Sequence, residues 1–333
     1  MSESFGEDFG QKVDLTASIR NILRNYPEGT AILKELVQNA DDAGARKISF
    51  CLDHRTHGVR NLPSASLEAF QGPSLLIYND AVFTAEDFQS IQRIGDSLKK
   101  TEDSRAKIGR FGIGFNAVYH WTDLPSFVSS SYLVMLDPQA KFLPNVNPSN
   151  PGKIIDFIKN PGLLNSYADQ FIPYQGQYLS NWKKPFQGTL FRLPLRTPVQ
   201  AHSSSLSTRA LSCANAKSLL ANLQLEASAM LLFLKSVECI EITEVLEDNS
   251  TRVLFQCAVG NQTNDLRSKR AVISNKQQQE KVLQSRNSSI IADYTLKINC
   301  VAHHYDDATD RDGKASAISA PREIGRASCR ERV

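Results

Sequence analysis

Long apolar runs, a strong net charge and closely spaced cysteines are all missing from this 333-residue sequence. No stretch of about eighteen consecutive apolar residues occurs, so the sequence offers no candidate for a transmembrane helix. The first residues, MSESFGED, are acidic and lack the basic and apolar stretches of a signal peptide. We therefore expect a cytoplasmic protein without a membrane span.

The low net charge and the lack of cysteine motifs argue against a nucleic-acid-binding protein, a disulfide framework and a zinc site. Lys and Arg number 38 against 35 Asp and Glu, so the net charge of +3 gives no broad attraction to nucleic acid, and we expect no nucleic-acid partner. None of the cysteines forms a C-x-x-C pair, which favours buried free thiols over a disulfide framework or a zinc site. The six cysteines are Cys51, Cys213, Cys239, Cys257, Cys300 and Cys329.

What is present is an ordinary globular composition, with 41% apolar and 22% charged residues. The chain is long enough for one large domain or two ordinary ones. Residues 323–333, EIGRASCRERV, have no helical or strand periodicity and resemble a translated sequencing adapter. We expect this tail to be an artefact and the natural protein to continue beyond residue 322.

Hydrophobic periodicity predicts alternating helices and strands. Helices are predicted at 12–25, 31–43 (with Thr30 as N-cap and Gly44 as its end), from Thr84 onward, 115–119 and 214–233. Strands are predicted at 47–52, 74–78, 126–130, 132–136, 188–194, 236–245, 252–258 and 292–303. Residues 138–187 are predicted to be an irregular insertion with one short helix at 153–159, and 203–207 a linker.

The predicted helix at 31–43 carries the first chemical motif. At about 100° per residue, Glu35, Asn39 and Asp42 fall on one stripe beside an apolar stripe. A carboxamide oxygen at such a place suits Mg²⁺, and a carboxylate can orient or deprotonate an attacking water. A solvated polar stripe would show the same spacing. The apolar stripe contains Leu33, Leu36, Val37 and Ala40.

Three further motifs follow along the chain. Gly109, Gly112 and Gly114 form G-x-x-G-x-G before a short helix, which permits close approach to an anion or simply makes a tight turn. Asn79-Asp80 ends an apolar strand, where it reads an exocyclic amine or forms a turn. Gly188-Thr189 lies in an apolar strand, where the hydroxyl needs a partner.

These motifs, in this order, resemble the nucleotide-binding domain of the GHKL ATPases, which include gyrase B, a heat-shock chaperone, histidine kinases and MutL. Longer strings, among them ILRNYPEGTAILKELVQNADDAGA and GRFGIGFNAVYHWTDLP, resemble the sacsin repeat domain over residues 5–245. The resemblance implies an α/β two-layer sandwich of Bergerat type, with a mixed, mostly antiparallel sheet and helices on one face. It implies a nucleotide-binding domain at 1–200 and a continuation of the repeat at 201–322.

The resemblance also implies roles for single residues. Glu35 would be the general base, Asn39 the Mg²⁺ ligand and Asp42 a helper on the same wall. The phosphates of ATP would be held by Gly109, Gly112, Gly114 and the amide of Phe115. A lid over the nucleotide would carry Ser97, Lys99 and Lys100. Thr189 would support the residue that reads adenine.

One departure separates this sequence from the superfamily. The usual D-x-G-x-G, whose Asp reads the adenine amine, is replaced by Asn79-Asp-Ala-Val-Phe83. An ungapped alignment puts Tyr78 at the reader's place, and a one-residue shift is needed to use Asn79 or Asp80. An Asn both donates and accepts, which weakens selectivity for an amine.

Two classes of function therefore stay open. The first is a chaperone-associated, Mg²⁺-dependent ATPase that binds ATP and ADP and acts on client proteins or co-chaperones. The second is a catalytically silent scaffold or protein-interaction domain with the same fold. Arg192 and Arg196 lie in a string, GTLFRLPLR, that resembles the family's sequence, and we expect them to be a surface basic pair or salt-bridge partners.

Overall fold

A computed structural model describes residues 14–26, 28–92, 114–260, 263–264, 267–268, 270, 293–296, 298–303, 322–323 and 327–330. Within them, ten strands form one sheet in the order β11-β10-β8-β7-β1-β2-β6-β3-β4-β5. All neighbouring strands in it are antiparallel except β1 and β7, which are parallel. The mixed, mostly antiparallel sandwich that the resemblance implied is confirmed.

The strands of the sheet are β1 (Lys47–Asp53), β2 (Ser74–Asn79), β3 (Ser126–Ser130), β4 (Tyr132–Leu136), β5 (Gly152–Asp156), β6 (Phe186–Pro194), β7 (Cys239–Val245), β8 (Thr251–Val259), β10 (Ile298–Ala302) and β11 (Arg322–Glu323). A separate pair joins β9 (Asp293–Leu296) to β12 (Ala327–Arg330). The α-helices are α1 (Leu15–Asn25), α2 (Thr30–Asp42), α3 (Ala85–Gln92), α4 (Pro161–Ser166), α5 (Ala168–Phe171), α6 (Pro198–Ser203) and α7 (Cys213–Phe233). The 3₁₀ helices are η1 (Ala65–Phe70), η4 (Phe115–His120) and η5 (Ile172–Tyr174).

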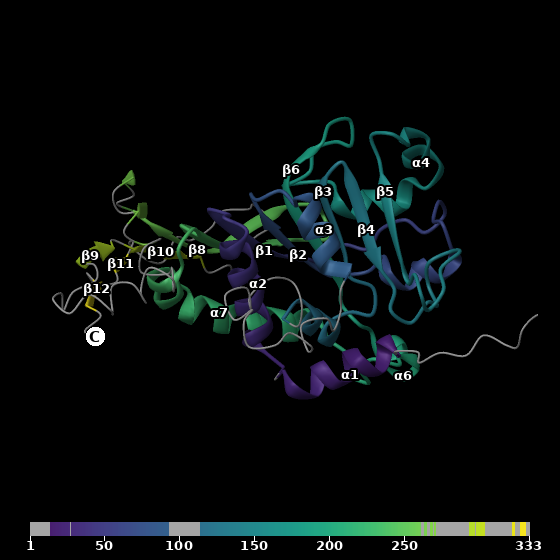
Figure 1. The fold of residues 1–333 in the computed structure, drawn as a ribbon, viewed down its shortest axis with the longest axis horizontal. Helices are drawn as coiled ribbons and strands as arrows, with labels where there is room; N and C mark the ends of the chain where they lie inside the picture. Colours follow the sequence, from purple (N-terminus) through teal and green to yellow (C-terminus); the bar gives the residue numbers. More distant parts are fainter. Residues whose placement is uncertain are drawn as a thin grey trace, which may run out of the picture.

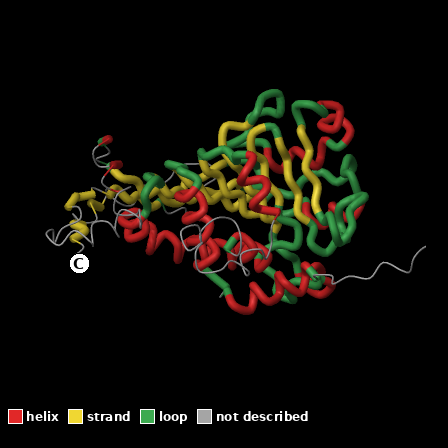
Figure 2. The backbone as a smooth tube through the Cα atoms, viewed as in Figure 1, coloured by secondary structure: helices red, strands yellow, loops and turns green. Residues whose placement is uncertain are grey.

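The longer helices share one side of the sheet (Figure 1). α2 and α7 pack on each other, α7 covers β1, β7 and β8, and α1 and α2 contact η4. Figure 2 shows α1, α2 and α7 in red below the yellow strands, with the shorter helices α3 and α4 elsewhere. Apolar side chains from α2, α7, η4 and the central strands form the main core here, with Leu33, Val37 and Leu223 fully buried.

The opposite face of the sheet carries a second core, to which η1, α5, η5 and the loops on either side of β5 contribute. Trp182 anchors this layer through edge-on contacts with Phe157, Phe171 and Tyr174, at ring-centroid distances of 4.9, 5.1 and 5.9 Å. The predicted helix at 153–159 is wrong, because this segment pairs with β4 as the strand β5 and the helices come later, as α4 and α5. Cross-strand pairing overrode the weak local helical pattern.

One further detail differs from the prediction. Thr30 is not the N-cap of α2 but its first residue, because Gly29 takes the cap position without a side-chain hydrogen bond. Beyond residue 200, where the resemblance implied a continuation of the repeat, β7 pairs with β1 in the same sheet and α7 packs into the same core. The strands β11 and β12 include Glu323 and residues of the tail that follows it.

Candidate nucleotide site

The helix α2 presents its polar stripe at the edge of the core. Leu33, Leu36 and Val37 are buried against the sheet, and Glu35 and Asn39, one turn apart, are half-buried beside them. Gly44, with φ +80°, ends the helix in a conformation that suits glycine, as the sequence predicted. The stripe is therefore part of the wall between the core and a pocket.

Glu35 lies directly against the last glycine of the G-x-x-G-x-G motif. A Cβ atom added at Gly114 would overlap the Glu35 Oε2 atom and lie 3.0 Å from its Cδ atom, so any larger residue would require the Glu35 carboxylate to shift. Burial, with a smaller contribution from the negative charge of Asp42, raises the pKa of Glu35 above its usual value of 4.5. A carboxyl group with a raised pKa accepts a proton more readily near neutral pH.

Asn39, one turn further along α2, carries an unsatisfied polar atom. Its Nδ2 atom is buried and has no hydrogen-bond partner among the residues that the structure describes. A buried polar group without a partner costs about 1–3 kcal/mol, and such groups commonly point to a ligand, an ion or a water. Because the two ends of an amide are assigned from their surroundings, a half-turn brings the oxygen to the same place.

Asn39 opens onto a narrow pocket between α2, α3, η4 and the ends of β2 and β6. The cavity measures about 10 Å³, which is room for about one water molecule. Its lining combines three of the predicted motifs with Phe115, the residue after the glycines. The lining residues are Leu36, Asn39, Ala40, Ala43, Ile77, Asn79, Ala81, Val82, Phe83, Asp87, Phe115, Thr189 and Phe191.

The structure separates the residues proposed to read the base. Tyr78 stacks on Tyr178 on the opposite face of the sheet, with ring centroids 4.8 Å apart. Asn79, the next residue, lines the pocket. Asp80 is exposed, and its Oδ1 atom accepts the backbone N–H groups of Arg46 and Lys47 at 2.8 and 3.0 Å. Asp80 is thus engaged at the start of β1 and does not line the pocket.

Thr189 supports the pocket through the turn after β2. Its hydroxyl donates to the carbonyl oxygen of Ala81 at 2.8 Å, while the Ala81 N–H donates to Asn79 Oδ1 at 3.0 Å. Gly188 is required beside it, since its φ is +153° and a Cβ atom there would lie 2.7 Å from the carbonyl oxygen of Asn79. The predicted support of the reader by Thr189 is therefore indirect in this structure and passes through Ala81.

Ser129 on β3 completes this network and was missed from the sequence. Its hydroxyl lies 2.9 Å from the Thr189 hydroxyl, 2.9 Å from the Gly188 carbonyl oxygen and 2.9 Å from the Phe83 backbone nitrogen. Serine in a strand is common, and no local pattern marks it. Its role follows from the β3–β6 pairing, which sets Ser129 opposite Thr189.

The two aspartates at the end of α2 have structural contacts. Asp42 does not line the pocket and instead forms an ion pair with Lys235, at 2.6 Å between Oδ1 and Nζ. The role predicted for Asp42 on the pocket wall is therefore not supported by its position. Asp41, which the sequence did not single out, is buried and accepts the backbone N–H groups of Lys235, Ser236 and Val237 at 3.1, 2.7 and 2.8 Å.

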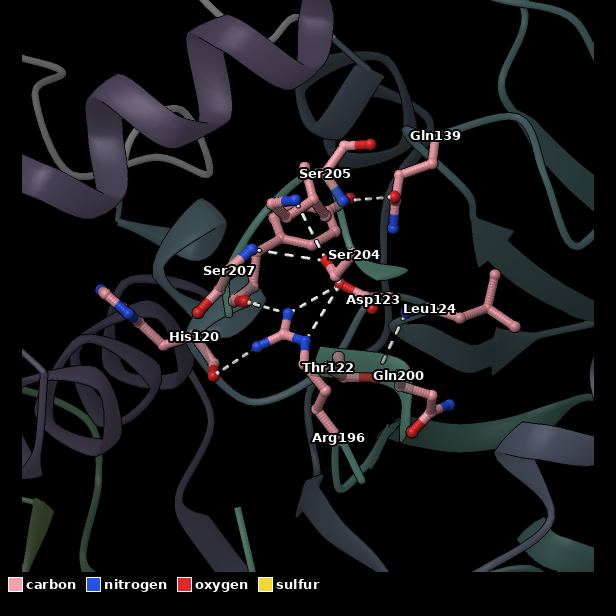
Figure 3. A network of polar contacts seen from close by, with 12 residues as sticks. His120, Thr122, Asp123, Leu124, Gln139, Arg196, Gln200, Ser204, Ser205 and Ser207 are labelled. Atoms are coloured by element: carbon pink, nitrogen blue, oxygen red, sulfur yellow. Dashed lines mark hydrogen bonds and ion pairs between the residues drawn. The ribbon is translucent and has the colours of Figure 1, made fainter. Parts of the chain in front are cut away.

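The two family arginines are buried rather than exposed. Arg196 forms the predicted salt bridge, to Asp123 at 2.8 Å, inside a polar network (Figure 3). Arg192 lies on the opposite face from the pocket and donates to the Gly72 carbonyl oxygen at 3.1 Å. Of the two alternatives, the surface basic pair is wrong, because both Arg192 on β6 and Arg196 in the segment after it are buried. The remaining predicted site residues Ser97, Lys99, Lys100, Gly109 and Gly112 fall outside the described residues.

Comparison with known proteins decides the family. The sequence profile described as "Sacsin domain" matches residues 12–256. The chain belongs to the sacsin domain family. Human sacsin is 38% identical over 256 residues, which is 75% of this chain but only 5% of that much longer protein. This sacsin domain also matches a solved "N terminal domain of a DNA repair protein" at 10% identity, with a TM-score of 0.38, over 79% of this chain and 62% of the other.

No described helix of the domain is both long and apolar enough to cross a bilayer. Within the described residues, no three or more His, Cys, Asp or Glu side chains gather as a metal site, and the described cysteines (Cys51, Cys213, Cys239, Cys257 and Cys300) are free thiols.

Proposed function

We propose that this sacsin domain binds Mg-nucleotide, with ATP as the nucleotide that its family resemblance implies, and hydrolyses it as part of a chaperone-associated protein. The observation that carries this proposal is the juxtaposition at α2. The Glu35 carboxylate, with its raised pKa, lies against Gly114, and Asn39 one turn away has a buried amide group without a partner. A carboxyl group with a raised pKa, next to a glycine and to a buried amide nitrogen without a partner, is typical of a ligand-binding site.

The residues have distinct roles in this proposal. Glu35 orients and deprotonates the attacking water, and Asn39 holds Mg²⁺ through its carboxamide oxygen. Glu35 lies against Gly114, and the amide of Phe115, which follows this glycine, is the proposed donor to phosphate. When bound, Mg²⁺ neutralises charge on the phosphates. Gly109, Gly112, Ser97, Lys99 and Lys100 complete the phosphate and lid contacts that the resemblance implies.

The cellular setting is also part of the proposal. Closure of a lid over nucleotide would change the surface that client proteins or co-chaperones meet, so that binding energy is coupled to client handling. We place this activity in the cytoplasm. The chain spans about a twentieth of human sacsin, so the full protein would supply further client-binding parts.

A silent scaffold is the alternative, and one observation favours it. The pocket of about 10 Å³ has room for about one water and not for a base, and its lining includes the packed rings of Phe83, Phe115 and Phe191. Nucleotide binding therefore requires these aromatic side chains to move. In the scaffold alternative they stay, and the sandwich serves as a surface for other proteins.

Calorimetric titration of the chain with Mg-ATP separates the two functions. Asn39→Ala removes the proposed Mg²⁺ ligand without touching Glu35, and Gln38→Ala is the matched control, because Gln38 is exposed on the neighbouring position of α2. We expect micromolar binding by the wild type and by Gln38→Ala, and none by Asn39→Ala. Turnover is then compared with Glu35→Gln. Absence of heat for the folded wild type would establish the scaffold instead.

A further inference from the structure

Two free thiols face each other across adjacent strands near one edge of the sheet (Figure 1). Cys257 on β8 and Cys300 on β10 are directly opposite partners in the antiparallel register. Residues in such a pair point to the same face and have Cα atoms about 4.5–5.5 Å apart. Disulfides span Cα distances of about 4.4–6.8 Å. The strand pairing therefore brings the two sulfurs within bonding reach, although residues 258–299 separate them along the chain.

The two thiols differ in exposure and in acidity. Cys257 is fully buried in the main core, and Cys300, which is only partly buried, packs against the same core. A hydrogen bond between the two thiols raises the pKa of Cys257 and lowers the pKa of Cys300. Cys300 is thus the thiol that is both easier to reach from solvent and easier to ionise, which are the two properties of a reactive cysteine.

A third thiol, on the neighbouring strand, points elsewhere. Cys239 on β7 pairs with Ala258, whereas Cys257 pairs with Ile240. Successive side chains of a strand point to opposite faces of a sheet, so Cys239 lies on the other face from Cys257. The register therefore pairs Cys257 with Cys300 and not with Cys239.

We propose that Cys257 and Cys300 are a modification site, at which exchange with a low-molecular-weight disulfide forms a reversible disulfide, with Cys300 as the attacking thiol. In the first step the Cys300 thiolate bonds to one sulfur of the small disulfide, whose sulfur–sulfur bond breaks and releases a thiolate. In the second step the deprotonated Cys257 bonds to the Cys300 sulfur and displaces the second small thiolate. The protein loses two electrons to the small disulfide, and the two protons of its thiols pass through solvent to the departing thiolates.

The cross-link would join β8 to β10 covalently and close residues 258–299 into a loop. A long closed loop restricts the unfolded chain, so the oxidised protein should resist unfolding more than the reduced protein does. Strand register brings the two cysteines together, which is why no cysteine motif marks the pair in the sequence. The proposal does not depend on nucleotide binding.

Peptide mapping by mass spectrometry tests the proposal. The reduced chain is incubated with glutathione disulfide, and the remaining thiols are then blocked by alkylation. We expect the cross-link between Cys257 and Cys300 to be about tenfold more abundant than that of any other cysteine pair, because exchange depends on thiolate character and access. Dithiothreitol should reverse it, and the midpoint of urea unfolding should be higher for the oxidised form.

Three variants separate the roles of the thiols. Cys257→Val keeps an apolar residue in the core and should stop the reaction at a mixed disulfide between glutathione and Cys300. Cys300→Ser should leave Cys257 reduced, because a buried thiol is then the one left to react. Cys239→Ser is the matched control and should form the cross-link at the rate of the wild type.

Three results would overturn the proposal. The first is a wild type in which the mixed disulfide at Cys300 persists without a cross-link to Cys257. The second is a cross-link that involves Cys239. The third is a folded wild type in which both thiols stay reduced, while the same chain unfolded in urea reacts with glutathione disulfide.

Discussion

Two polar clusters of this domain use similar residue types in opposite ways. In the first, all three guanidinium nitrogens of Arg196 are bonded (Figure 3). Nε and Nη2 donate to Asp123 Oδ1 at 3.1 and 2.8 Å, and Nη1 and Nη2 donate to backbone carbonyl oxygens. In the second, at α2 and β2, Glu35 has a raised pKa and Asn39 has a buried amide nitrogen without a partner.

The difference shows how to separate structural from functional polar groups. Both clusters are buried or half-buried, so burial alone does not distinguish them. The pairing of the carboxylate does: Arg196, which follows β6, donates to Asp123 and joins η4 to the segment after α6, whereas the raised pKa of Glu35 reflects burial and the charge of Asp42. Buried atoms without a partner occur in both clusters, as Asp123 Oδ2 and Gln139 Nε2 in the first and Asn39 Nδ2 in the second.

The largest effect on stability is expected from breaking the buried ion pair between Arg196 and Asp123. Arg196→Met removes the partner of a buried carboxylate, and we expect a loss of about 3–5 kcal/mol in the free energy of unfolding. Arg209→Met is the matched control, because Arg209 pairs with Glu28 while 68% exposed, and its loss should stay below about 1 kcal/mol. Urea unfolding measures both. Equal losses would mean that the network carries no special stability.

A smaller effect on stability should distinguish the adjacent residues Asp41 and Asp42 on α2. Asp41→Ala leaves three backbone N–H groups without their carboxylate, so we expect a loss of about 3 kcal/mol. Asp42→Ala removes a partly exposed ion pair with Lys235 and should cost less than about 1 kcal/mol. Thermal unfolding of the two variants compares them. A larger loss at Asp42 would contradict the structural role given to Asp41.

In contrast, removing the Asn39 amide, whose nitrogen has no partner, should barely change the free energy of unfolding. Asn39→Ala deletes a buried group that makes no hydrogen bond through its nitrogen, so we expect the free energy of unfolding to change by less than about 1 kcal/mol, while Mg-nucleotide binding is lost. Urea unfolding of the nucleotide-free protein provides the measurement. A loss near that of Arg196→Met would place Asn39 among the structural residues.

The smallest effect is a pH dependence with opposite signs at two carboxylates. The pKa of Glu35 is raised when the chain folds, so the stability from this group is present below its usual value of 4.5 and is lost as pH rises through the folded value. Glu35→Gln lacks this loss and should gain stability relative to the wild type between about pH 4 and about pH 7. Chemical unfolding across this range tests it, and a constant difference would mean that the pKa of Glu35 is not raised.

The contribution of Asp53 to stability should depend on pH with the opposite sign. Although burial opposes its ionisation, the neighbouring His57 side chain and the hydrogen bonds from Arg55 lower the pKa of Asp53 to about 2. Its contribution to stability is therefore present above the usual 3.8 and is lost as pH falls toward about 2. Asp53→Asn should remove this acid sensitivity, whereas Glu35→Gln should not.

The sequence by itself determined the regular elements that have strong periodicity and the motifs that lie close together on them. α2, β3, β4 and α7 have the predicted bounds to within one or two residues, because their apolar spacing and end signals agree. The placement of Glu35 beside Asn39 follows from helical spacing alone.

Only the tertiary structure decided which polar groups meet and which are satisfied. Neighbouring residues Tyr78, Asn79 and Asp80 look equivalent as candidates, and sheet pairing sends them to opposite faces and to the start of β1. Similarly, Asp41 and Asp42 differ through contacts with residues about 190 positions away. Hydrogen-bond satisfaction depends on strand order and register, which no local pattern encodes.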